Sequence, residues 1–190
     1  MKTNVFLVRH AHSVYTPDEL HRPLSERGVS DAKKVTEQLK GEGITVCISS
    51  PYQRAIQTIE GISQVKNLKI IIEEDFRERL LSGIPVEDFA SAMNKVWENP
   101  SFCLEGGESN LVAQERGVGA LHNVIKAHAG ENIVIGTHGN IMILIMNYFD
   151  PSFDFTAWQQ LDMPDIYKLS FNDVELIEIT SVWSREKSLR

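Results

Sequence analysis

The sequence predicts an α/β fold of three layers, a mainly parallel central sheet with helices on both faces. Short aliphatic, β-branched runs alternate along the chain with segments of helical period, which is typical of parallel strands joined by helical crossovers. Two of these runs, residues 5–8 and 133–135, are apolar at every position, as in strands that are buried on both faces.

Length and composition limit the classes of protein to consider. At 190 residues we expect a single domain over residues 1–190, with a lid-like excursion at about 80–108. No apolar run approaches the about 20 residues of a membrane span. The first strand follows Met1 closely and leaves no room for a signal peptide, which predicts a cytoplasmic protein. A net charge of −7 argues against nucleic acid and anionic membranes as partners, and we expect a monomer or a homodimer.

The first half of the chain predicts three strands and two helices. The strand at 5–8 leads into a polar loop at 12–22 and then an amphipathic helix ending near 39, with Ser25 as its cap. Its sheet-facing residues are expected to be Val29, Ala32, Val35 and Leu39. The second strand is expected at 44–48, and Ser50 and Pro51 suit the N-cap and first position of the next helix. A third strand is expected at 68–72.

The second half begins with the excursion at 80–108, which contains Pro85 and an expected helix at 86–97, where a lid would lie. A long helix at 109–128 is followed by a strand at 132–136 and a very apolar helix at 141–146. Alternation between 167 and 179 predicts two further strands.

Charged and titratable side chains follow the ends of several predicted strands. His10 and His138 each follow a buried strand, Arg9 precedes His10, and Arg54 falls in the first turn of the helix after the second strand. Ligands of open α/β sheets bind at the carboxyl ends of the strands. Two guanidinium groups and two imidazoles at this edge suit a tetrahedral oxyanion such as a phosphoryl group. Separate polar residues at loop edges are the alternative, and the shared strand-end placement argues against it.

Three neighbours of these residues are further candidates for substrate binding. Ser13 and Thr137 have hydroxyl groups that could donate to a phosphate, or could cap their loops instead. His12 could contact the substrate or be a solvated loop residue. A metal site formed by His10, His12 and His138 fits the ligand type, but no metal-ligand spacing supports it, so no metal or cofactor is expected.

Six segments, in order, resemble motifs of one family. Those segments are LVRHAHS, PLSERG, SSPYQRAIQT, FRER, GGES and GTHGN. Together they resemble the signature elements of the histidine phosphatase superfamily, with its phosphoglycerate mutase-like fold. The resemblance covers most of the chain.

The resemblance implies a role for each matching residue. His10 would be the nucleophile that becomes a phosphohistidine, while Arg9, Arg54 and His138 would hold the equatorial oxygens and stabilise the transition state. Glu78 would be the general acid that protonates the leaving alkoxide and then the base that activates water. No metal would be required.

The identity of the acid has several candidates, because Glu73, Glu74 and Asp75 lie in the same stretch as Glu78. Glu78 matches the family's spacing from Phe76, although Gly83 comes five residues later where the family often has a glycine four later. Glu108 is the alternative acid, and its other interpretation is a helix-start residue favoured by the helix dipole.

The resemblance leaves three functions open. The first is a metal-independent phosphomonoester hydrolase acting on a small phosphorylated metabolite. The second is a phosphoglycerate mutase, which usually needs extra basic residues in its cap, whereas Lys95 is the one basic residue between 80 and 108. The third is a non-catalytic phosphate-binding module, and the presence of both histidines, both arginines and a carboxylate argues against it.

Overall fold

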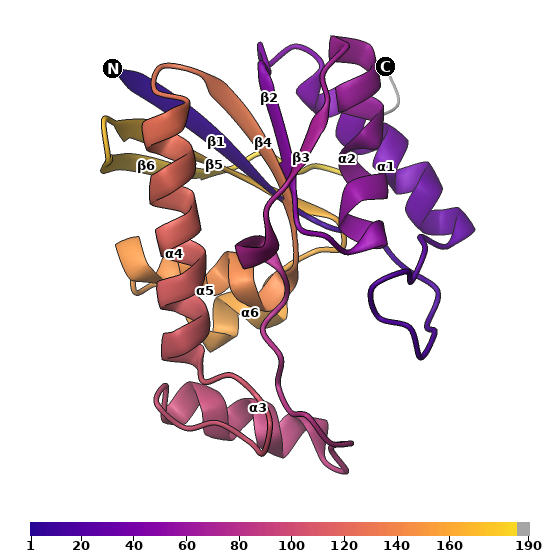
Figure 1. Cartoon of the computed structure of the whole chain (residues 1–190), viewed down its shortest axis with the longest axis vertical. Helices are drawn as coiled ribbons and strands as arrows, with labels where there is room; N and C mark the ends of the chain where they lie inside the picture. Colours follow the sequence, from indigo (N-terminus) through magenta and orange to yellow (C-terminus); the bar gives the residue numbers. More distant parts are fainter. Residues whose placement is uncertain (186–190) are drawn as a thin grey trace.

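A six-stranded sheet forms the centre of the protein in the computed structural model, which describes residues 1–185. Its strand order is β3-β2-β4-β1-β5-β6 (Figure 1). The strands are β1 Lys2–Arg9, β2 Val46–Ser49, β3 Ile70–Ile72, β4 Asn132–Thr137, β5 Asp165–Asn172 and β6 Glu175–Ser181.

The sheet combines a parallel part with an antiparallel edge. Strands β3, β2, β4 and β1 are parallel neighbours, whereas β5 is antiparallel to β1 and β6 to β5. The two C-terminal strands are the pair predicted from the alternation near 167–179. The parallel strands bring the ends of β1, β2 and β4 to one edge of the sheet, where ligands bind in folds of this class.

Helices cover both faces, which confirms the predicted three-layer α/β fold. Helices α1 Glu26–Leu39 and α2 Gln53–Lys66 lie on one face, and α4 Asn110–Ala127 and α5 Gly139–Phe149 on the other (Figure 1). Alternate side chains of β1 enter the two cores, Phe6 and Val8 on the α1–α2 side and Val5 and Leu7 on the α4–α5 side. The middle of α5 is buried all round, which explains its almost uninterrupted apolar sequence.

Helix α1 is capped as predicted, because the Ser25 hydroxyl accepts a hydrogen bond from the Gly28 backbone N–H at 3.1 Å. Val35 and Leu39 are buried, but Val29 is 46% exposed, so the prediction that it faces the sheet is wrong. Gly28 is required by close packing, since a Cβ there would lie 2.0 Å from the carbonyl oxygen of His12. This contact holds the start of α1 against the end of the β1 segment.

Helix α2 begins later than the sequence predicts. Tyr52, not Ser50, is the N-cap residue, and Pro51 lies before the helix. The Ser50 hydroxyl accepts from the Tyr52 backbone N–H and is also hydrogen-bonded to the His138 ring, a partner that local sequence cannot reveal. Arg54 still falls in the first turn of the helix.

The excursion at about 80–108 follows a 3-10 turn, η1 Glu74–Phe76, and carries helix α3 Phe89–Glu98. Figure 1 shows α3 at the end of the molecule opposite the N-terminus. The chain segments that lead into and out of the excursion are joined by backbone hydrogen bonds, from Gly83 N to Glu105 O at 2.8 Å and from Glu108 N to Leu80 O at 2.7 Å. These two segments therefore run side by side between the body of the protein and α3.

A short helix that the sequence did not predict, α6 Phe155–Gln160, packs beside α5. Phe155 lies 5.9 Å from the Trp97 ring of α3, so α6 supports the excursion. The predicted long helix is α4, although its first apolar residues, Leu111 and Val112, are exposed. None of the helices within residues 1–185 combines the length and apolarity that crossing a membrane would need.

Candidate active site

The two motif histidines are brought together by the register of β1 and β4. Arg9 pairs with Thr137 across these parallel strands, and the His10 backbone N–H continues the ladder to Thr137 O at 2.9 Å. His10 and His138 therefore occupy the next rung, and their ring centroids lie 5.2 Å apart. Side chains that share a rung point to the same face of a sheet.

The His10 ring is held in one tautomer. Its Nδ1 lies 2.7 Å from the carbonyl oxygen of Ala11, which can only accept, so Nδ1 carries the proton. Its Nε2 therefore carries a lone pair and no proton, and this lone pair accepts from Arg54 Nε at 3.3 Å. This is the arrangement that a nucleophilic imidazole needs.

Burial keeps His10 uncharged. Desolvation, with the nearby charges of Arg54 and Arg9, outweighs the hydrogen bond to Ala11 and lowers the pKa of His10 from 6.5 to about 3. Between these two values the unfolded chain binds a proton that the folded protein does not. The stability linked to this ring is therefore fully present above pH 6.5 and is lost as the pH falls toward 3.

His138 lies fully buried with one ring nitrogen free. The Ser50 hydroxyl lies 2.7 Å from Nε2, and the Tyr52 ring packs edge-on at 4.9 Å. Burial, His10 and the neighbouring arginine charges lower the pKa of His138 well below its usual range, so the ring is neutral. The Ser50 hydroxyl occupies Nε2, whereas Nδ1 has no partner within residues 1–185. A protonated Nδ1 would find the acceptor that a buried donor needs in an oxyanion.

Arg54 is positioned by the first turn of α2 and is 4% exposed. Its Nη1 donates to the Glu19 carbonyl oxygen at 2.8 Å, and its Nη2 lies 3.2 Å from the Glu19 carboxylate. The guanidinium also packs over the Tyr52 ring at 4.7 Å. Arg54 thus places a fixed positive charge directly beside His10.

Arg9 approaches from the opposite face of β1. Its Nη1 donates to the carbonyl oxygens of Leu161 and Asp162 at 3.1 and 3.0 Å, while its Nε is buried and unpartnered within residues 1–185. The side chain passes over the start of α5, where a Cβ on Gly139 would lie 3.0 Å from Arg9 Nε. The glycine of the GTHGN segment therefore makes room for the guanidinium.

Glu78 lies at the N-terminus of α5, beside His138. Its Oε1 accepts from the backbone N–H groups of Arg79 and Ile141 at 2.9 and 3.0 Å. Its Oε2 accepts from the Asn140 N–H at 3.1 Å and from the Asn140 side-chain amide at 3.4 Å. Glu78 therefore satisfies the backbone donors at the start of the helix that follows His138. Burial lowers the pKa of Arg9 and of Arg54, and the charge of Glu78 opposes this lowering.

The alternative acid, Glu108, is engaged elsewhere. Its two oxygens accept from Nε and Nη2 of Arg116, both at 3.0 Å, and Arg77 lies at 3.5 Å. Burial raises the pKa of Glu108, but the bonds from Arg116 and the Leu80 N–H outweigh it, so the net pKa lies below its usual range. This carboxylate is suited to an ion pair. Of the other candidates, Glu73 caps the η1 turn and Asp75 pairs with Arg77.

Two of the predicted site residues, Thr137 and His12, have their side-chain polar groups directed to other partners, and a third, Ser13, takes part in a backbone pairing. The Thr137 hydroxyl donates to the Phe76 carbonyl oxygen at 2.9 Å. The His12 Nδ1 lies 2.8 Å from the Ser25 hydroxyl at the start of α1. Ser13 forms an isolated antiparallel bridge with Leu24. No three or more His, Cys, Asp or Glu side chains within the described part of the chain are grouped as metal ligands.

Several residues of the site were not identified from the sequence. Ser50 and Tyr52 contact His138, and Asn140 contacts Glu78. Arg79 is 3% exposed, with Nη2 3.1 Å from the Met93 sulfur and 3.4 Å from Asn140 Oδ1. Ser50 follows a strand end, as His10 and His138 do, and this position was the one available signal in the sequence.

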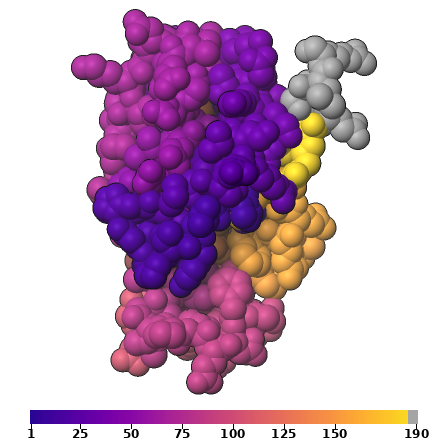
Figure 2. Space-filling model, turned by 90° about the vertical axis from the view of Figure 1, so that its right-hand side faces the viewer, coloured from indigo at the N-terminus to yellow at the C-terminus, as the bar shows by residue number. Residues whose placement is uncertain are grey.

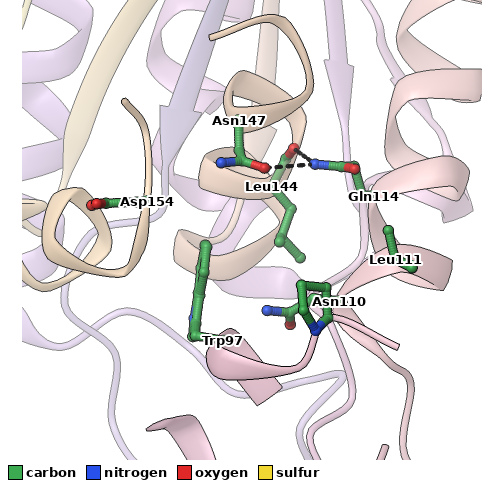
Figure 3. A pocket seen from close by; sticks show the side chains of 8 residues that line it. Trp97, Asn110, Leu111, Gln114, Leu144, Asn147 and Asp154 are labelled. Carbon is green, nitrogen blue, oxygen red and sulfur yellow. Dashed lines mark hydrogen bonds between the residues drawn. The ribbon is translucent and has the colours of Figure 1, made fainter. Parts of the chain in front are cut away.

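A cavity of about 240 Å³ lies between α3 and the helices α4, α5 and α6 (Figure 3). Its walls are formed by Trp97, Pro100, Asn110, Leu111, Gln114, Leu144, Asn147 and Asp154. None of these is Lys, Arg or His, so the cavity offers no cation for a phosphoryl group. It shares no lining residue with the histidine cluster.

A family model for the histidine phosphatase superfamily (branch 1) matches residues 5–179. Phosphoserine phosphatase 1 of Hydrogenobacter thermophilus is 33% identical over 147 residues, covering 70% of this chain and 70% of that protein. A probable phosphoglycerate mutase of Cronobacter sakazakii is 28% identical over 148 residues, covering 71% of this chain and 69% of that protein. A solved mycobacterial glucosyl-3-phosphoglycerate phosphatase has the same fold, with a TM-score of 0.77 at 19% identity, covering 96% of this chain and 99% of that one.

Proposed function

Because the chain belongs to the histidine phosphatase superfamily (branch 1), we propose that the cluster around His10 is the active site of its phosphomonoester hydrolase activity. In the first step, His10 Nε2 attacks phosphorus, the bond to the ester oxygen breaks, and a phosphohistidine forms. Arg9, Arg54 and the Nδ1–H of His138 bind the equatorial oxygens, whose negative charge grows in the transition state. Release of the Arg54 Nε contact frees the His10 lone pair for this attack.

Glu78 is the proposed general acid and base. It gives a proton to the departing alkoxide, then takes a proton from the water that attacks the phosphohistidine, so that inorganic phosphate leaves and His10 is restored. Both Glu78 oxygens accept hydrogen bonds in the free protein. Protonation therefore requires one of them to lose a donor, and the longest contact, with the Asn140 side chain at 3.4 Å, is the first that we expect to open.

One observation carries the proposal. A neutral imidazole with its Nε2 lone pair free of a proton lies against a buried guanidinium, and a second buried imidazole beside it has an unpartnered nitrogen. Each of these groups lacks something that a phosphoryl group provides, an electrophile for His10 and an acceptor for His138.

The substrate class that we propose is a small phosphorylated metabolite. Relatives named as a phosphoserine phosphatase and a glucosyl-3-phosphoglycerate phosphatase support this class. In the excursion, Met93 and Val96 are buried against the body, whereas Leu80 and Phe89 are about half exposed, 52% and 55%. The exposed pair would present apolar surface to a leaving group. A cytoplasmic location and a monomeric or homodimeric state stay predictions.

Turnover of p-nitrophenyl phosphate tests the proposal. We expect hydrolysis to persist in excess EDTA, because guanidinium and imidazole donors stabilise the phosphoryl charge. We also expect orthovanadate to inhibit the hydrolysis competitively. Initial rates measured by absorbance, with and without each reagent, provide the check. Loss of turnover on EDTA treatment that added metal restores would contradict the proposal. A coupled assay for conversion of 3- to 2-phosphoglycerate distinguishes a hydrolase from a mutase. In this assay we expect the protein to show no interconversion beyond the hydrolysis of either compound.

Replacing Glu78 with glutamine is expected to slow poor leaving groups far more than good ones. An alkyl phosphate such as phosphoserine needs a proton on its departing oxygen and should lose about 10²- to 10³-fold in kcat, while p-nitrophenyl phosphate should lose about tenfold or less. The ratio of the two rates is the measurement. Equal losses for the two substrates would show that Glu78 does not supply the proton.

A structural effect of this change is also expected, and it must be separated from the catalytic one. The glutamine amide presents hydrogens to the backbone N–H groups that Glu78 now accepts from, so the start of α5 should lose about 1 kcal/mol of stability. Thermal unfolding measures this loss. Glu73→Gln, in the same segment but bonded within the η1 turn, is the matched control for removing one carboxylate.

A further inference from the structure

The loop between β1 and α1 places a carboxylate between two guanidinium groups beside His10. Glu19 forms an ion pair with Arg22 through Oε1, and its Oε2 lies 3.2 Å from Arg54 Nη2. Its backbone carbonyl accepts from Arg54 Nη1. One carboxylate therefore bridges two cations with its two oxygens, as two oxygens of a phosphoryl group would.

These contacts use every nitrogen of Arg54. Nε points to His10, while Nη1 and Nη2 are engaged by Glu19. Three of the five N–H groups of Arg54 are thus engaged, and a phosphoryl oxygen that binds Nε and Nη2 together would meet the Glu19 carboxylate at Nη2. The Glu19 side chain is 50% exposed, so among the partners of Arg54 its carboxylate is the one that water can most easily hydrate once it is displaced.

Arg22 faces the same centre from the loop. Its side chain is 19% exposed, its guanidinium packs over the Tyr15 ring at 5.5 Å, and its Nε is buried without a partner in residues 1–185. The charge of Arg22 contributes to lowering the pKa of Arg54, after burial, and those of His10 and His138. Two like charges this close need an anion between them.

We propose that Arg22 is a further phosphoryl-binding residue of this site, and that the Glu19 carboxylate is an internal anion which occupies the phosphoryl position until substrate displaces it. The proposal rests on the proposed function. It makes Glu19 a competitor of both substrate and product. In Figure 2 the indigo N-terminal part of the chain, to which this loop belongs, lies on the face turned to the viewer, where a ligand could approach it.

The test is binding of inorganic phosphate by isothermal titration calorimetry at constant pH and ionic strength, which needs no turnover. Glu19→Gln keeps the shape and the carbonyl contact of Glu19 but removes the competing charge, so phosphate should bind about fivefold more tightly. Arg22→Met removes a guanidinium donor and should weaken binding about tenfold or more. Asp18→Asn, the neighbouring charge, which pairs with His21, should leave binding unchanged.

The sign of the Glu19→Gln effect decides between a competitor and a positioning residue. Weaker phosphate binding, with kcat lowered as well, would mean that Glu19 merely orients Arg54 and would overturn the proposal. Unchanged affinity in Arg22→Met, or no phosphate binding by either the wild type or Glu19→Gln, would also overturn it. In turnover assays, we expect Glu19→Gln to have a lower KM and stronger product inhibition. If phosphate binds most tightly to Glu19→Gln and most weakly to Arg22→Met but the protein hydrolyses no ester, the hydrolase proposal is refuted and the assignment of Arg22 stands.

Discussion

Replacing His10 with alanine is expected to lower kcat for p-nitrophenyl phosphate by at least about 10⁴-fold, to background. The reason is that the phosphoryl group would have no acceptor. The other imidazole of the cluster, His138, is fully buried and has its Nε2 engaged by Ser50. Initial rates give the loss, and an alkaline quench of wild-type enzyme with labelled substrate should trap a phosphoenzyme that the variant lacks.

The control for this variant is His128→Ala, which removes a partly buried imidazole that follows α4, bonded to Glu131 at 3.4 Å. It should retain wild-type rates. Circular dichroism must show that His10→Ala is folded, and His10→Asn provides a second variant of closer shape. Activity within tenfold of wild type in a folded His10 variant would refute the nucleophile assignment.

Replacing Arg54 with methionine is the second change with a large expected effect, a loss of about 10³-fold in kcat/KM, or about 4 kcal/mol of transition-state stabilisation. The substitution removes the fixed charge that contacts His10 and that we propose binds an equatorial oxygen. Methionine keeps most of the buried volume, the substitution removes the repulsion between Arg54 and Arg22, and the Glu19 carboxylate that loses its partner is 50% exposed and can be hydrated. We therefore expect the midpoint of thermal unfolding to be unchanged or higher.

Two further variants sharpen the Arg54 result. Arg54→Lys keeps a charge but not the planar fork, so it should recover only a part of the lost rate. Arg27→Met removes an exposed arginine of α1 that pairs with Asp31 at 3.7 Å, and should be fully active. A folded Arg54→Met with at least a tenth of wild-type kcat/KM would show that Arg54 does not bind the reacting group.

The architecture could be predicted because the sequences of its most buried elements are apolar throughout, which indicates burial directly. The apolar runs of β1 and β4 and the uninterrupted apolar stretch of α5 have no place except the interior. Ser25 and Ser109 cap helices through a local hydrogen bond, which a sequence shows directly. The failures are cases in which distant contacts decided. Val29 fits the helical period but is exposed, and α6 has only six residues and no period to detect.

In the candidate site, too, features that local sequence indicates could be predicted, and contacts between distant residues could not. That His10, Arg54 and His138 lie close together could be predicted, because His10 and His138 directly follow strand ends and Arg54 falls in the first turn of the helix after β2. Ser50 was interpreted as a helix cap because its partner, the His138 ring, is 88 residues away in the chain. The Glu19–Arg54 contact was not predicted at all, since it depends on how the 12–22 loop folds back.

The hydrogen-bond ladder between β1 and β4 has a consequence for how this protein can change. His10 and His138 share a side of the sheet because both strands run uninterrupted up to them, each in step with the other. One residue gained or lost inside Lys2–Arg9 would turn every later side chain over and send the imidazole to the side now occupied by Arg9. Insertions in the excursion at about 80–108 would leave the register of β1 and β4 intact. Diversity can therefore accumulate in the connections, while the length of two short strands stays constrained by chemistry.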